Sequence, residues 1–82
     1  MTSTHYEIIV KGRKTGAILT YNQFGTLHSI SRVEGIELGE WDSFLKYLIP
    51  KNLDRMNMNE CDWVAFRELP KEEVITMLVK PI

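Results

Sequence analysis

Hydrophobic and polar residues alternate along the first third of the chain with a period of two, which is the period of a half-buried β-strand. Residues 5–11 and 17–22 show this alternation, and residues 26–33 are expected to form a third strand. Two short segments that contain glycine separate them, at residues 12–16 and 22–25, and are typical of tight turns. Consecutive strands joined by short turns are antiparallel neighbours. The sequence therefore predicts a three-stranded antiparallel β-meander.

The hydrophobic spacing changes to that of a helix over residues 40–49. The apolar positions i, i+3, i+4, i+7 and i+8 are Trp41, Phe44, Leu45, Leu48 and Ile49. They form one continuous apolar stripe, and Pro50 ends the helix because the residue before a proline is disfavoured in the α region. We expect this stripe to cover one face of the sheet, since the rest of the chain offers no larger surface to bury it. Trp41 and Phe44 are therefore predicted core residues.

The last third of the chain fits two assignments. A helix over residues 60–69 would begin after the N-cap candidate Asn59 and stop at Pro70, and segment 74–79 would follow as a buried strand. In the reverse order, residues 63–69 form a strand and Pro70 opens a helix. We favour helix followed by strand because segment 74–79 is continuous, apolar and rich in β-branched residues, and the order stays open.

A chain of 82 residues is long enough for one hydrophobic core and too short for two. Together the patterns predict a single α+β domain over residues 1–82. Its three-stranded antiparallel meander is covered on one face by the amphipathic helix at about residues 40–49, and its C-terminal third adds one helix and one strand.

Several turn and strand residues line up as K-T-G-x-x-x-T-Y-x-x-x-G-x-L-x-S, beginning at Lys14 and ending at Ser29. This pattern resembles the N-terminal segment of uncharacterised phage and prophage proteins, in which a helix rich in tryptophan or leucine tends to follow. A short stretch similar to residues 66–70 comes after that helix. The resemblance implies a phage-derived accessory protein, and its motifs specify a fold more than a chemistry.

Charge and cysteine content limit the functional classes to which this protein can belong. Ten basic residues stand against eleven acidic ones, for a net charge of −1, whereas a protein that relies on phosphate contacts usually shows a basic excess. The single cysteine, Cys61, cannot form an internal disulfide, and we interpret it as a buried, unreactive core residue. The first residues lack the features of a signal peptide, and no apolar run approaches the roughly 20 residues of a membrane helix. The sequence predicts a cytoplasmic protein with no membrane segment.

Residues for catalysis are scarce. His5 and His28 are the two candidates for a base at neutral pH, and neither belongs to a motif with a serine or cysteine nucleophile. One cysteine and two distant histidines do not supply the spaced ligand pairs of a zinc site, and residues 12–16 lack the spacing of a phosphate-binding loop. We therefore predict no catalytic residue, no cofactor and no metal, and a protein that is not an enzyme.

Two binding functions remain. We expect a non-catalytic protein-interaction module, either a phage-derived accessory protein or a host-directed inhibitor, that binds another protein or a second copy of itself through an open sheet edge or face. Because aromatic and arginine side chains dominate interfaces, the candidate interface residues are Tyr21, Phe24, Trp63, Arg13 and Arg32. The alternative is a nucleic-acid-binding accessory protein that uses the basic first hairpin. Its candidate residues are Lys11, Arg13 and Lys14.

Overall fold

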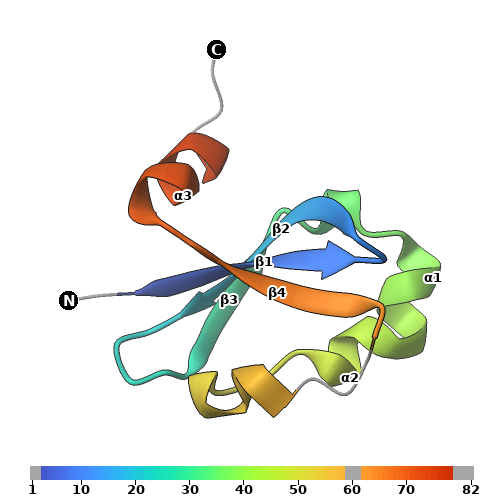
Figure 1. Cartoon of the computed structure of the whole chain (residues 1–82), viewed down its shortest axis with the longest axis horizontal. Coiled ribbons are helices and arrows are strands. Elements are labelled where there is room, and N and C mark those ends of the chain that lie inside the picture. Colours follow the sequence, from blue (N-terminus) through green and yellow to red (C-terminus); the bar gives the residue numbers. More distant parts are fainter. Residues whose placement is uncertain (1–2, 59–61, 79–82) are drawn as a thin grey trace.

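A computed structural model describes residues 3–58 and 62–78 and shows a four-stranded antiparallel sheet with the strand order β3-β2-β1-β4 (Figure 1). The strands are β1 (Thr4–Val10), β2 (Arg13–Tyr21), β3 (Leu27–Ser31) and β4 (Val64–Leu69). The first three form the expected meander, and β4 adds a further strand beside β1. The protein is thus a small α+β structure whose sheet has one strand more than the predicted meander.

The turn between β1 and β2 is shorter than the predicted loop. Lys11 and Gly12 alone form it, with φ angles of 52° and 78°, and Val10 pairs directly with Arg13. Two successive residues in the left-handed region are the mark of a type I′ turn, whose twist matches that of the flanking strands. The predicted turn at residues 12–16 was therefore wrong, since β2 already begins at Arg13.

The K-T-G part of the sequence pattern forms a bulge within β2. Ile9 pairs with Lys14 and Glu7 with Ile18, so that Ile8 alone faces Thr15, Gly16 and Ala17. The Thr15 hydroxyl donates to the Ile8 carbonyl oxygen (2.6 Å) and accepts from the Ala17 N–H (3.1 Å). Gly16 takes a φ of 79°, which a residue with a Cβ adopts only at a cost. The buried threonine thus replaces ladder hydrogen bonds that the extra residues interrupt.

The predicted helix is confirmed and begins two residues earlier than expected. Three helical turns follow one another without a break: α1 (Leu38–Glu40), η2 (Trp41–Leu45), which has π-helical spacing, and α2 (Lys46–Leu48). At the start, the Glu37 N–H donates to the Glu40 carboxylate (3.2 Å). Of the predicted stripe, Leu45 and Ile49 are buried, and Trp41 and Leu48 are partly buried against the core. The side chain of Phe44 lies outside the described part of the structure.

In the C-terminal third the favoured order was wrong: the strand β4 comes first and the helix α3 (Lys71–Leu78) follows. β4 pairs with β1 from His5 opposite Leu69 to Val10 opposite Val64. Pro70 lies directly before α3, and its carbonyl oxygen accepts the N–H groups of Glu73 (3.0 Å) and Val74 (3.1 Å). The ladder with β1 therefore decides the order. The β-branched residues of segment 74–79 did not predict it, because tertiary pairing overrides local propensity.

Within the part of the chain that the structure describes, two hydrophobic clusters lie on opposite faces of the sheet. The larger one joins the face that carries Ile8, Leu19 and Tyr21 to the helical segment 38–48 and to η3 (Leu53–Met58). The smaller one lies under α3 and consists of Ile18, Leu69, Val74 and Met77. Figure 1 shows α3 near the N-terminal end of β1, well away from α1 and α2. The thick helical layer therefore covers one face, and α3 covers part of the other.

Candidate functional site

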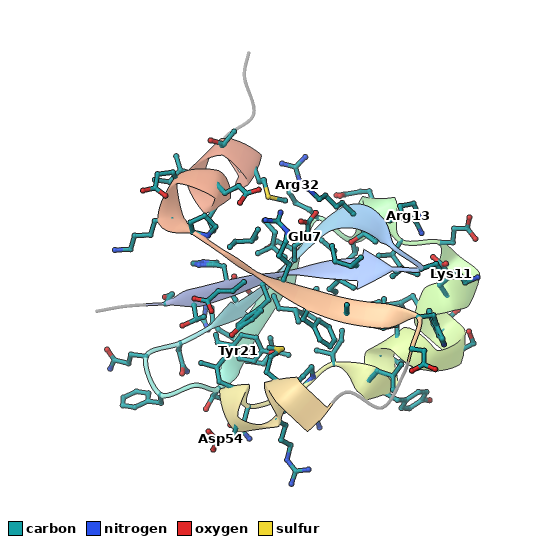
Figure 2. The ribbon with its side chains drawn as sticks, in the orientation of Figure 1. Glu7, Lys11, Arg13, Tyr21, Arg32 and Asp54 are labelled. Carbon is teal, nitrogen blue, oxygen red and sulfur yellow. The ribbon has the colours of Figure 1, made fainter. Side chains whose placement is uncertain are left out.

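The three basic residues of the first hairpin have different surroundings, and Figure 2 labels two of them, Lys11 and Arg13. The Lys11 ammonium lies 6.0 Å from the centre of the Trp63 ring. The Arg13 guanidinium donates to the Gly35 carbonyl oxygen (2.6 Å) and to the Glu40 carboxylate (3.0 Å). Lys14, the next residue along β2, lies on the opposite face from Arg13. Lys11, Arg13 and Lys14 therefore do not converge on one ligand position.

Tyr21, a candidate interface residue, is not exposed. Its side chain is fully buried, its hydroxyl donates to the Pro50 carbonyl oxygen (2.6 Å), and its ring meets Tyr6 edge-on at 6.0 Å. Burial raises the pKa of Tyr21 to about 12. Tyr21 shares the inner face of β2 with Leu19, beneath the helical layer, and so it is a core residue and not an exposed aromatic anchor.

The other two aromatic candidates lie at opposite ends of the sheet. Phe24 is 80% exposed in the turn between β2 and β3, at the Thr4 end of β1. Trp63 is partly buried just before β4, at the Val10 end, where its carbonyl oxygen accepts the Lys11 N–H (2.6 Å). Phe24 and Trp63 therefore do not belong to one surface.

Arg32 is exposed and begins a short segment that packs on the β2 bulge. Its φ of 59° turns the chain out of β3 into η1 (Val33–Gly35). Gly35 lies so close to β2 that a Cβ atom there would come within 1.9 Å of the Thr15 carbonyl oxygen. The Arg13 guanidinium also donates a hydrogen bond to the Gly35 carbonyl oxygen. These interactions hold η1 in one position against the sheet.

An apolar pocket opens where η1 meets the start of α1. Val33, Ile36, Leu38 and Trp41 line a hollow of about 140 Å³, which we call the Trp41 pocket. Ile36 is buried and Trp41 partly buried, whereas Val33 is 43% and Leu38 75% exposed. All four side chains are apolar, and the surface they form is accessible from solvent. The pocket can therefore accept an apolar group without any rearrangement of the fold.

Sequence reasoning missed this pocket for a physical reason. Trp41 matched the helical stripe and was assigned to the core, and Val33 and Leu38 belong to different local elements. The available signal was the mixture of apolar and acidic residues between positions 33 and 42.

A buried carboxylate lies on the opposite face of the sheet. Glu7 accepts a hydrogen bond from the Arg67 guanidinium (2.6 Å) and another from the Gly16 N–H (3.1 Å). Arg67 also holds Glu73 of α3 through two hydrogen bonds (3.0 and 3.1 Å). The bonds from Arg67, aided by the charge of Lys14, keep the pKa of Glu73 below its usual range. This network attaches α3 to the sheet, and its satisfied carboxylates are poorly suited to act as a general base.

The two histidines lie on different strands. His5 lies on β1, where burial lowers the pKa of its imidazole, and His28 is exposed on β3. Within residues 3–58 and 62–78, no three histidine, cysteine, aspartate or glutamate side chains come close enough to hold a metal ion. None of the helices in those ranges is long and apolar enough to span a membrane. Cys61, predicted to be buried, lies outside the described residues.

Comparisons with protein-family models, with curated proteins and with solved structures found no match for this chain. The resemblance to phage and prophage proteins therefore stays a prediction. Evidence for a function must come from the site itself.

Proposed function

We propose that this protein is a non-catalytic protein-interaction module and that the Trp41 pocket is its binding site. The observation that carries the proposal is an apolar hollow of about 140 Å³ with an exposed wall, Leu38, on the surface of a small domain. Interfaces between proteins gain most of their free energy where an anchor side chain fills such a pocket.

The rigidity of the pocket walls supports the proposal. One wall, η1, is fixed by the close approach of Gly35 to Thr15 and by the hydrogen bond from Arg13. The other wall, Trp41, belongs to the helical segment that packs on the main core. A site that is already formed loses little conformational entropy when a partner binds, and this favours affinity for a small contact area.

Features of the sequence support a biological setting for this module. The K-T-G pattern that begins at Lys14 supports a phage-derived accessory protein or a host-directed inhibitor, and the use of a single cysteine supports a cytoplasmic location. The nucleic-acid alternative has less support. It requires Lys11, Arg13 and Lys14 to act together, whereas Arg13 already pairs with Glu40.

The test compares two exposed apolar residues at different places. Short random peptides are selected on the immobilised parent protein, and the affinities of the enriched peptides are then measured for Leu38→Ser and Phe24→Ser. Both residues are largely exposed, at 75% and 80%, so that both variants should fold like the parent. Burial of a leucine side chain contributes roughly 1.5–3 kcal/mol, and Leu38→Ser should therefore weaken binding at least about tenfold.

Phe24→Ser should leave binding unchanged. The proposal is wrong if no peptide is enriched, or if the enriched peptides bind Leu38→Ser as tightly as the parent. If Phe24→Ser loses binding and Leu38→Ser does not, the binding site lies at the turn between β2 and β3 instead.

A further inference from the structure

We infer that the Trp41 pocket binds a single apolar side chain on a partner segment that carries lysine or arginine next to it. This inference rests on the proposed function and names the chemistry of the partner. Two independent properties of the site support it: the size of the pocket and the distribution of charge around it.

The size of the pocket sets the number of anchor side chains. Its volume is about 140 Å³, and a cavity of about 150 Å³ accommodates a benzene ring. One leucine, isoleucine, methionine or phenylalanine side chain fills such a space. Sites for cofactors and drug-sized ligands are larger, at roughly 300–1,000 Å³. The pocket therefore fits one anchor residue of a polypeptide.

The chain segment that contains the pocket is acidic. Residues 33–42 contain all four lining residues, and between them stand Glu34, Glu37, Glu40 and Asp42, with no basic residue. The whole chain has ten basic and eleven acidic residues, so the rest of it has ten basic against seven acidic residues, a net charge of +3. The acidic excess of this protein is concentrated in the ten-residue segment that contains the four lining residues of the pocket.

Nearby arginines neutralise part of this charge. Arg13 pairs with Glu40 at 3.0 Å, and Arg32 directly precedes the segment. Four acids and these two arginines leave a local charge of −2. Glu34, Glu37 and Asp42 are exposed, and none of them makes an ion pair with a residue in the described ranges. We call these three residues the acidic rim.

The acidic rim determines which residues of the partner are favoured next to the anchor residue. The acidic rim attracts basic residues that lie beside the anchor side chain. This attraction mainly speeds association and disfavours acidic competitors. Acidic segments and nucleic-acid phosphates are repelled from the same place. Because the rim is exposed, salt should screen the effect over a Debye length of about 10 Å at 0.1 M.

The experiment extends the peptide selection with two triple variants. The rim variant carries Glu34→Gln, Glu37→Gln and Asp42→Asn, which keep the side-chain shapes and remove the charges. The matched control carries Asp54→Asn, Asp62→Asn and Glu72→Gln, three exposed acids elsewhere in the chain. Affinities of the enriched peptides are measured for the parent and for both variants at low and high salt.

We expect the enriched peptides to share one large apolar residue with lysine or arginine within two positions of it. The rim variant should bind them on the order of fivefold more weakly at low salt, as expected for the loss of exposed charge pairs, and the difference should vanish at high salt. The control variant should bind like the parent.

Peptides with acidic or uncharged flanks that still depend on Leu38 would overturn this inference and leave the proposed function standing. Peptides that bind Leu38→Ser as tightly as the parent would overturn the proposed function itself. A parent protein that dimerises at the assay concentration, with Leu38→Ser monomeric, would identify a second copy of the chain as the occupant and likewise overturn the inference.

Discussion

Replacement of Gly35 by alanine should separate η1 from the sheet, while the same change at Gly39 should do no harm. A Cβ atom at Gly35 would lie 1.9 Å from the Thr15 carbonyl oxygen and 2.9 Å from its carbonyl carbon. Thr15 cannot retreat, because it is buried in the β2 bulge and its hydroxyl is bonded to Ile8. A Cβ atom at Gly39, within α1, would meet no atom within 4 Å.

The expected cost follows from two losses. Forcing an extra group into a packed contact costs about 1–3 kcal/mol. The displacement of η1 also breaks the hydrogen bond from Arg13 to the Gly35 carbonyl oxygen, which contributes about 1 kcal/mol at a half-exposed site. We therefore expect Gly35→Ala to lower the free energy of unfolding by about 2–4 kcal/mol. Gly39→Ala should raise it by up to about 1 kcal/mol, since alanine is the better helix former.

Urea denaturation of the parent and both variants, followed by circular dichroism, measures these changes. In thermal unfolding, the same loss of about 2–4 kcal/mol corresponds to a fall in Tm of at least about 8 °C for a domain of this size. Equal stability of Gly35→Ala and Gly39→Ala would show that η1 does not pack on the β2 bulge, and the pocket would then lack one of its walls.

Three further predictions concern the core and the carboxylate network. Tyr21→Phe leaves the buried Pro50 carbonyl oxygen without its donor and should cost about 1–3 kcal/mol in urea denaturation. Since the pKa of Tyr21 is raised to about 12 in the folded state, the parent should lose stability as the pH rises from about 10 to 12, and Tyr21→Phe should lose less. Leu45→Ala removes a fully buried side chain and should lower the free energy of unfolding by about 2–5 kcal/mol in urea denaturation.

The third prediction concerns Glu73, whose pKa is lowered in the folded state. The ionised carboxylate therefore stabilises the fold at pH values above the ordinary pKa of glutamate. This stability is lost as the pH falls through the pKa of the folded state. Stability measured against pH should therefore fall less steeply on the acid side for Glu73→Gln than for the parent.

Much of the architecture could be predicted from residue patterns. The alternation over residues 5–11 and 17–22 largely coincides with β1 and β2, which end one residue earlier, at Val10 and Tyr21. The stripe that includes Leu45 and Ile49 packs against the core, as predicted. Such patterns are reliable because each reports which side of an element faces the core, and this depends on residues close together in the chain.

The site could not be predicted in the same way. Val33, Ile36, Leu38 and Trp41 meet because Gly35 approaches Thr15, and nothing in the local sequence indicates that contact. Tyr21 has the composition of an interface residue, but its position in β2 places it beneath the helical layer. Exposure of an aromatic residue is a property of the packed fold, and composition alone does not determine it.

By itself, the sequence determined an α+β domain with a β-meander and one amphipathic helix, because periodicity acts over a few residues. The tertiary structure decided the order of strand and helix after Trp63, the bulge at Gly16 and the pairing of Glu7 with Arg67. Glu7 and Arg67 stand sixty residues apart in the chain and face each other on neighbouring strands. Contacts of that kind depend on the register between strands, which is set only when the whole sheet assembles.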